Sequence, residues 1–209
     1  MYYYANDTSQ WQLLKPYLTP PRYQLAVDRG VKLVVPKKSH GPWQDPAFVT
    51  VWNELKKFEL YRSVYHYFEP TYNANTQLDA LFQNLTPQDL TSPMWLDVER
   101  VHYMDKSLVI RRMLDVLYGM KAWSGMPVAI YTSASKFNYY YSNKPGWGND
   151  WMLVVAHYGP ANPVLPNGWE DWDGWQFSAD KNGLGRFFGY QSASVDVDLV
   201  KPQLLGGAN

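Results

Sequence analysis

The sequence of 209 residues contains no cysteine. This absence excludes a disulfide framework, a thiolate nucleophile and a zinc–cysteine site. The chain also lacks an excess of either charge, with 19 basic and 19 acidic residues, whereas a nucleic-acid surface needs a marked basic excess. No run approaches the roughly 18 apolar residues of a membrane helix. We therefore expect neither nucleic acid nor a membrane as a partner.

Two further patterns are missing. Neither common type of glycine-rich phosphate loop occurs, and the 4 histidines form no cluster that suggests a metal site. We therefore expect no cofactor and no metal. What the sequence does have is aromatic residues, at 17%, with 10 Trp and 17 Tyr. Aromatic rings with polar edges suit a sugar-binding groove, but many of them simply fill a core, so composition alone favours carbohydrate binding only weakly.

Short apolar runs rich in β-branched and aromatic residues predict strands, and helical spacing of apolar residues between several of them predicts helices. The predicted strands are 2–4, 33–35, 63–67, 94–98, 128–131, 153–156, 175–177 and 195–199. The predicted helices follow the candidate caps Asp45 and Asp105 and also cover 78–85. The early strands recur about every 30 residues, the size of one βαβ unit. After residue 145 the helical periodicity disappears.

This alternation predicts an α/β fold with a largely parallel sheet. We expect a single irregular (β/α) barrel of the TIM-like kind, with a last third made mostly of strands and few helices. An open Rossmann sheet fits less well. We expect one catalytic domain over residues 1–209, with no separate cell-wall-binding module.

Two acids end the apolar run that begins at Met94. Asp97 and Glu99 are two residues apart, so in a strand they face the same side, at the end of the strand where barrels carry their chemistry. Neighbouring carboxyl groups interact, so one of them tends to keep its proton. Such a pair supplies the general acid and the charged stabiliser that glycosidic cleavage needs. Alone, Asp-x-Glu is more often a solvated strand end.

Acids also accompany the first and last predicted strands. Asp7 follows the first strand, and Asp196 lies in the apolar alternation of the last one. First and last strands are neighbours in a barrel, so both acids could reach the mouth that holds Asp97 and Glu99. Asp198 shares a face with Asp196 and competes for this role.

With these acids aligned, the chain resembles the glycoside hydrolase family 25 lysozymes, the phage and Chalaropsis type of N-acetylmuramidase. The resemblance covers nearly the whole chain and rests on eight short motifs in order. They are Asp7-Thr8-Ser9-Gln10-Trp11-Gln12, Lys37-Lys38-Ser39-His40-Gly41, Tyr65-His66-Tyr67-Phe68, Leu96-Asp97-Val98-Glu99, Ile130-Tyr131-Thr132-Ser133, Ala156-His157-Tyr158, Trp175-Gln176-Phe177-Ser178 and Val195-Asp196-Val197-Asp198. The chain departs from the pattern where His40 replaces an acid, where Asp198 replaces an asparagine, and in its tyrosine-rich start.

The resemblance implies hydrolysis of the β-1,4 bond from N-acetylmuramic acid to N-acetylglucosamine in a peptidoglycan glycan strand, without a metal. It implies Glu99 as general acid and Asp97 as the group that stabilises the developing positive charge or orients a 2-acetamido group. Asp7 and Asp196 would complete the catalytic set. Retaining, inverting and substrate-assisted chemistry all stay open.

Other side chains are expected to bind substrate. Tyr131 could hydrogen-bond near the cleavage point, and Tyr65 and Tyr67 could line the groove. Lys37 could meet a substrate carboxylate, and Trp175 could stack on a sugar. The alternative for each of these side chains is that it only packs in the core. His66 and His157 are expected to be hydrogen-bonded structural residues.

Three other functions fit parts of this pattern. A chitinase with the motif Asp-x-x-Asp-x-Asp-x-Glu would need an acid at position 95, where this chain has Trp95. A non-catalytic glycan-binding or virion structural protein on the same scaffold would have no need to keep all the acids. A barrel enzyme with a metal held by the acids is the third.

The start of the chain, residues 1–7, lacks the basic and apolar regions of a signal peptide. Together with the missing cysteine, this favours a phage endolysin that stays in the host cytoplasm until lysis. A mature secreted enzyme acting at the bacterial cell wall is the alternative. We expect a monomer.

Overall fold

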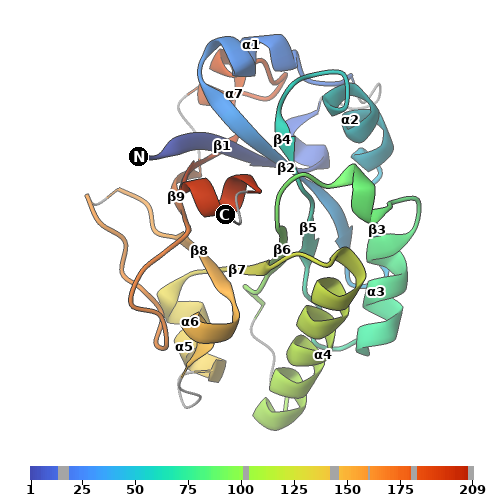
Figure 1. Ribbon diagram of the computed structural model, residues 1–209, viewed down its shortest axis with the longest axis vertical. Coiled ribbons are helices and arrows are strands. Elements are labelled where there is room, and N and C mark those ends of the chain that lie inside the picture. Colours follow the sequence, from blue (N-terminus) through green and yellow to red (C-terminus); the bar gives the residue numbers. More distant parts are fainter. Residues whose placement is uncertain (14–18, 101–103, 142–145, 160, 180–182, 207–209) are drawn as a thin grey trace.

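The computed structural model describes residues 1–13, 19–100, 104–141, 146–159, 161–179 and 183–206. Eight strands close into a barrel in the order β1, β2, β5, β6, β7, β8, β9, β10, with β10 back beside β1 (Figure 1). Their bounds are Tyr3–Thr8, Val31–His40, Tyr65–Tyr67, Met94–Asp97, Val128–Thr132, Met152–Ala156, Gly174–Ala179 and Asp196–Val200. The predicted α/β barrel is confirmed.

The direction of the last strand differs from that of the others. Strand β10 runs antiparallel to both β9 and β1, whereas the other neighbouring pairs of the ring are parallel. The beginning of β10 therefore lies at the mouth where the other strands end. Two short strands, β3 (Trp43–Gln44) and β4 (Tyr61–Arg62), pair with β2 outside the ring.

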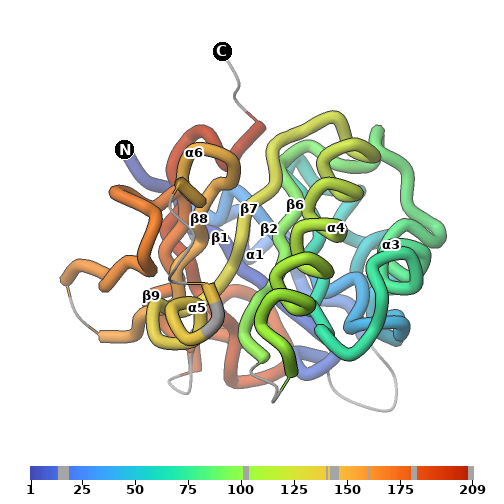
Figure 2. Tube along the Cα trace, turned by 90° about the horizontal axis from the view of Figure 1, so that it is seen from below, coloured from blue at the N-terminus to red at the C-terminus, as the bar shows by residue number. Residues whose placement is uncertain are grey.

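Helices surround the barrel, and Figure 2 shows α3 and α4 side by side along one flank. The α-helices α1 to α7 are Tyr23–Asp28, Phe48–Leu55, Ala74–Phe82, Lys106–Ser124, Ala134–Tyr141, Trp147–Asp150 and Leu184–Phe187. The last two have only 4 residues each, in keeping with the predicted scarcity of helices in the last third. Short 3-10 turns are η1 (Gln10–Gln12), η2 (Pro87–Asp89) and η3 (Pro202–Leu205).

One predicted helix cap is confirmed and one is wrong. The Asp105 carboxylate accepts a hydrogen bond from the Leu108 amide at 2.9 Å and begins α4, which ends at Gly125 with a left-handed φ of 69°. Asp45, by contrast, does not cap α2, which begins at Phe48. Asp45 lies in the turn between β3 and α2. Its carboxylate accepts from the Ala47 amide within that turn and from the Gln10 amide of η1.

Apolar side chains form two cores. The larger lies between the strands and the surrounding helices. The smaller lies inside the barrel, where Ala5, Leu33 and Val200 pack against Leu204 and Leu205 of η3. This turn follows the end of β10, and in Figure 1 its red ribbon crosses the centre of the ring. It therefore closes the end of the barrel opposite the mouth.

Two strand boundaries differ from the prediction in ways that matter for the site. Strand β1 extends through Asp7 to Thr8, because Asp7 pairs with Val35 on one side and with Asp196 on the other. Strand β6 ends at Asp97, so Glu99 lies two residues beyond the strand. None of the helices within the described ranges has the length and apolar character needed to span a bilayer.

Candidate active site

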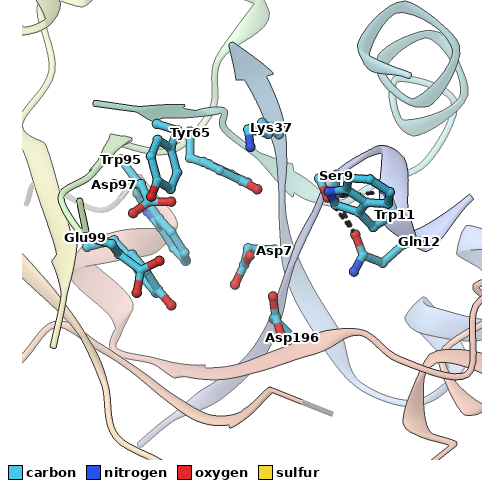
Figure 3. A pocket seen from close by; sticks show the side chains of 12 residues that line it. Asp7, Ser9, Trp11, Gln12, Lys37, Tyr65, Trp95, Asp97, Glu99 and Asp196 are labelled. Carbon is cyan, nitrogen blue, oxygen red and sulfur yellow. Dashed lines mark hydrogen bonds between the residues drawn. The ribbon is translucent and has the colours of Figure 1, made fainter. Parts of the chain in front are cut away.

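A cavity of about 230 Å³ opens at the carboxyl ends of the parallel strands (Figure 3). Its wall combines acids, aromatic rings and one lysine. The lining residues are Asp7, Ser9, Trp11, Gln12, Lys37, Tyr65, Tyr67, Trp95, Asp97, Glu99, Tyr131 and Asp196. In Figure 3, Asp7 and Asp196 lie together and face Asp97 and Glu99 across the cavity. All four predicted acids are therefore gathered in one place.

Backbone hydrogen bonds fix the position of the Asp97–Glu99 segment. The Asp97 carbonyl accepts from the Phe68 amide at 2.9 Å, and the Val98 amide donates to the Tyr131 carbonyl at 2.8 Å. The Val98 side chain is buried in the outer core. Asp97 and Glu99 consequently point to the same side, into the cavity, as predicted from their spacing.

The two acids have different surroundings. Asp97 is buried, and its Oδ1 has no hydrogen-bond partner among the described residues. Burial, followed by the charge of Glu99, raises the pKa of Asp97 well above its usual range, although Lys37 and Lys136 act in the opposite direction. Glu99 is one-quarter exposed, and its Oε1 lies 3.2 Å from Nζ of Lys136 on α5. Asp97 therefore lies in surroundings that favour its protonated, neutral form. Glu99 lies beside the cation of Lys136.

A hydrogen-bond network holds Asp7. Its Oδ2 accepts from Nε2 of Gln176 at 2.7 Å. The Oε1 of Gln176 accepts from the hydroxyls of Tyr131 and Tyr158, each at 2.7 Å. The two tyrosines therefore fix which end of the amide faces Asp7. Burial raises the pKa of Asp7 well above its usual range, and the charges of Asp196 and Asp198 raise it further.

The choice between Asp196 and Asp198 is decided by depth. Both lie on the inner face of β10, but Asp196 pairs with Asp7 and lines the cavity, whereas Asp198 pairs with Ala5 deeper in the barrel. Asp198 has no exposed surface, and neither carboxyl oxygen has a hydrogen-bond partner among the described residues. Burial and then the charge of Asp196 raise the pKa of Asp198 well above its usual range.

The predicted groove residues Lys37, Tyr65 and Tyr67 share one wall of the cavity. The Lys37 Nζ lies 5.1 Å from the centre of the Tyr67 ring and 5.8 Å from that of Tyr65. A cation at this range is attracted by the ring faces. This wall therefore offers a positive charge and two aromatic rings opposite the acids.

Trp175, expected either to stack on a sugar or to pack in the core, lies outside the cavity lining. Its side chain belongs to the outer core, where its indole N–H donates to the His157 carbonyl at 2.8 Å. The reason is the alternation of β9: the inner face at the level of the mouth is polar, so Gln176 points inward and Trp175 outward. Gln176 and its partner Tyr158 received no role from the sequence, although both lie inside the motifs of the late strands.

Other cavity residues also received no role from the sequence. Ser9 and Gln12 form a capping box around η1, with the Ser9 amide donating to Gln12 Oε1 at 2.7 Å (Figure 3). Trp11, on the same turn, is 69% exposed. The opening hexapeptide was the signal that pointed to these three. Trp95 is two residues before Asp97 on the same strand, so strand alternation was a signal for it. Lys136 had no signal, because only the fold brings α5 to Glu99.

The two histidines expected to be structural are hydrogen-bonded. His66 is buried between Ser39 Oγ at 2.8 Å and Gln77 Oε1 at 3.1 Å, and burial lowers its pKa to about 4. His157 Nδ1 accepts from the Val164 amide at 2.7 Å. Within the described part of the chain, no group of three or more acids and histidines is arranged to hold a metal ion. The arrangement instead suits proton transfer and stabilisation of positive charge by carboxylates.

Known proteins resemble this chain over most of its length. The curated Lysozyme M1 of Streptomyces globisporus is 26% identical over 206 residues, which cover 93% of this chain and 66% of that protein. The uncharacterized protein YegX of Escherichia coli K12 is 28% identical over 175 residues, or 82% of this chain and 61% of that protein. The chain thus spans about three-fifths to two-thirds of the length of these relatives.

Solved structures share the fold. The bacterial lysozyme from Streptomyces coelicolor aligns with a TM-score of 0.82 at 23% identity, covering 97% of this chain and 95% of that one. A family GH25 lysozyme from Aspergillus fumigatus aligns with a TM-score of 0.80 at 21% identity, covering 99% and 100%. The model of the family described as glycosyl hydrolases family 25 matches residues 6–185. The chain belongs to glycosyl hydrolases family 25.

Proposed function

We propose that the protein hydrolyses the glycan strand of peptidoglycan, at the β-1,4 bond from N-acetylmuramic acid to N-acetylglucosamine. The observation that carries this proposal is the meeting of four carboxyl groups, from Asp7, Asp97, Glu99 and Asp196, around one cavity. Family membership and relatives named as lysozymes support the same reaction. No step of this chemistry calls on a cofactor.

In this proposal Glu99 is the general acid. It lies beyond the end of β6, is one-quarter exposed and lines the cavity, so it can reach the oxygen of a leaving sugar. Its proton passes to that oxygen as the bond from the anomeric carbon breaks. Lys136 Nζ lies 3.2 Å from Glu99 Oε1 on the side of α5.

Asp97 stabilises the positive charge that develops on the sugar, or accepts a hydrogen bond from the N–H of the 2-acetamido group. The unpartnered Oδ1 suits either role. Burial and then the Glu99 charge raise the pKa of Asp97, so the neighbouring carboxyl groups hold a proton that they can share. For the step, the shared proton lies on Glu99 and Asp97 is the carboxylate; transfer of the proton to the leaving oxygen leaves both groups negative, with Asp97 opposite the cationic sugar.

The bond cleaved can be identified from the new end. Purified protein is incubated with peptidoglycan, the products are reduced with borohydride, and the fragments are analysed by mass spectrometry. We expect N-acetylmuramitol at the new end. Reduced N-acetylglucosamine would indicate a glucosaminidase, and peptide release without new reducing ends would indicate an amidase; either result would overturn the muramidase proposal. Binding without any cleavage would support the non-catalytic alternative.

A further inference from the structure

A row of aromatic rings leads from the cavity wall onto the surface. It consists of Tyr67, His40, Trp43 and Tyr72, and we call it the aromatic shelf. Tyr67 lines the cavity, and the His40 ring centre lies 4.5 Å from it. His40 contacts Trp43 at 5.9 Å, and Trp43 contacts Tyr72 at 5.3 Å, both edge to face. The shelf is therefore continuous with the candidate active site.

The shelf rests on a fixed backbone. Residues 40 and 43 pair across the tight turn between β2 and β3, and the Gly41 amide donates to the Tyr67 carbonyl at 3.0 Å. Gln44 Nε2 donates to Gln83 Oε1 at 2.5 Å, which ties β3 to the end of α3. Gly41 has a φ of 51°, and a Cβ there would lie 3.0 Å from Cβ of Glu69, so the turn requires glycine. The hairpin thus holds Trp43 in place although this side chain is 56% exposed.

The charges under the shelf are already paired. Glu69 is buried, forms an ion pair with Arg100, lies 3.6 Å from His40 Nε2 and accepts from Thr71 Oγ1 at 2.9 Å. Burial, and then the charge of Lys37, lower the pKa of His40, which keeps the imidazole neutral at neutral pH. The rings of the shelf are therefore uncharged and have polar edges, a combination that packs against the C–H faces of sugars.

The cavity is too small to hold a whole glycan strand, so such a strand must also contact the surface outside it. At about 230 Å³ it is smaller than the roughly 300–1,000 Å³ of ordinary small-ligand pockets. A glycan polymer cut there must extend over the surface on at least one side. The shelf begins at the cavity wall and is the aromatic surface that such a strand would meet on the side of Tyr67.

We propose that the aromatic shelf is an outlying sugar subsite, which binds a unit of the same glycan strand away from the bond that is cut. The proposal rests on the function proposed above. Trp43 is the specificity-determining residue of this subsite. It contributes to the affinity for long strands more than to the turnover of a short glycan that occupies the cavity alone.

The test compares Trp43→Ala with the control Tyr118→Ala. Tyr118 is 54% exposed and contacts Trp151 edge to face at 5.2 Å, so it matches Trp43 in exposure and packing, but it lies on α4 away from the cavity. We expect Trp43→Ala to raise KM for long peptide-free glycan strands roughly 3- to 10-fold, the value of one aromatic contact. The ratio of kcat/KM between long strands and a tetrasaccharide should fall by a similar factor, and Trp43→Tyr should restore most of it. Tyr118→Ala should change neither value.

A binding measurement separates this proposal from the catalytic one. Glu99→Gln protein, with or without Trp43→Ala, is sedimented with insoluble peptidoglycan and titrated with peptide-free strands. Weaker binding of the double variant supports the subsite even if the wild-type protein cuts a different bond. Equal binding and an unchanged long-to-short ratio in an active enzyme overturn the subsite alone. Binding of stem peptides but not of peptide-free strands, or a Trp43-dependent dimer without glycan, also overturns it.

Discussion

At the base of the barrel, Ala5, Leu33 and Val200 fill the interior together with η3, whereas the mouth above them is lined with charged groups. The change takes place within two residues on each of β1, β2 and β6. Ala5 is followed by Asp7, Val35 by Lys37, and Trp95 by Asp97. Strand β10 runs the other way and passes from Asp196 through Asp198 to Val200.

The apolar base and the charged mouth of the barrel have opposite effects on the stability of the fold. The base removes apolar surface from water, which stabilises the fold by about 25 cal/mol per Å². The mouth buries carboxyl groups without full hydrogen bonding, which opposes folding. The raised pKa values of Asp7, Asp97 and Asp198 are the sign of this cost. We infer that the apolar base and the outer core hold the acids in positions that they would not adopt alone, and the following variants test this division.

The largest expected effect is the loss of activity when Glu99, at the mouth of the barrel, is replaced. Glu99→Gln removes the proton donor but keeps the shape of the side chain, so we expect kcat to fall about 10²- to 10⁴-fold. The thermal midpoint should stay close to that of the wild type, because Glu99 is partly exposed and its ion pair with Lys136 contributes little stability. Reducing-end release and differential scanning calorimetry measure the two quantities. Activity close to that of the wild type would remove Glu99 from its proposed role.

The complementary change is at the base. Leu33→Ala leaves a void beside Val200 and Leu204, and we expect a loss of about 2–5 kcal/mol in the free energy of unfolding. At a temperature where the variant is folded, its kcat/KM should remain near the wild-type value, because no cavity residue is removed. Urea denaturation gives the stability, and the same activity assay gives the rate. A large loss of kcat in fully folded protein would show that base and mouth are not separable.

Much of this division could be predicted from the sequence. The β-branched and aromatic runs identified the strands of the barrel, and the spacing of Asp97 and Glu99 predicted that both face one side. Local patterns carry such information because they depend only on residues close in the chain. The convergence of Asp7 and Asp196 followed from barrel closure, which makes first and last strands neighbours.

The positions of Asp196, Asp198 and Gln176 depend on long-range strand pairing, which the sequence does not reveal. The antiparallel direction of β10 and its register against β1 place Asp196 at the cavity and Asp198 below it, and no local pattern distinguishes the two acids. Trp175 was assigned to the groove because an aromatic ring suits a sugar. The inner face at the mouth is polar, however, so Gln176 occupies it.

A moderate effect is expected inside the barrel, between mouth and base. Asp198→Asn replaces a buried carboxyl group with a neutral group of the same shape. The pKa of Asp198 is raised in the folded state. Below its unfolded pKa of about 3.9, the carboxyl group is protonated in both states and does not change the free energy of unfolding. As the pH rises above that value, Asp198 lowers the free energy of unfolding increasingly. The variant should therefore match the wild type near pH 4 and become the more stable protein toward neutral pH, by at most about 1.4 kcal/mol per pH unit.

Urea denaturation of both proteins from pH 4 to 8 measures this difference. Leu33→Ala provides the contrast, because its loss should not depend on pH. A wild-type protein that gains stability over Asp198→Asn as the pH rises would show that the folded protein stabilises the Asp198 charge, contrary to the burial described above.

The smallest expected effect concerns the cation beside the acids. Lys136→Met removes the charge 3.2 Å from Glu99 Oε1, and the same charge lowers the pKa of Asp97. Without it the pair holds its proton more tightly, so the alkaline limb of kcat/KM against pH should move upward, by less than about one unit because Lys136 is almost half exposed and solvent screens it. Lys57→Met is the matched control, since Lys57 forms a 2.6 Å ion pair with Glu54 on α2, outside the cavity lining. A downward shift, or an equal shift in both variants, would mean that Lys136 does not control the protonation of the catalytic pair.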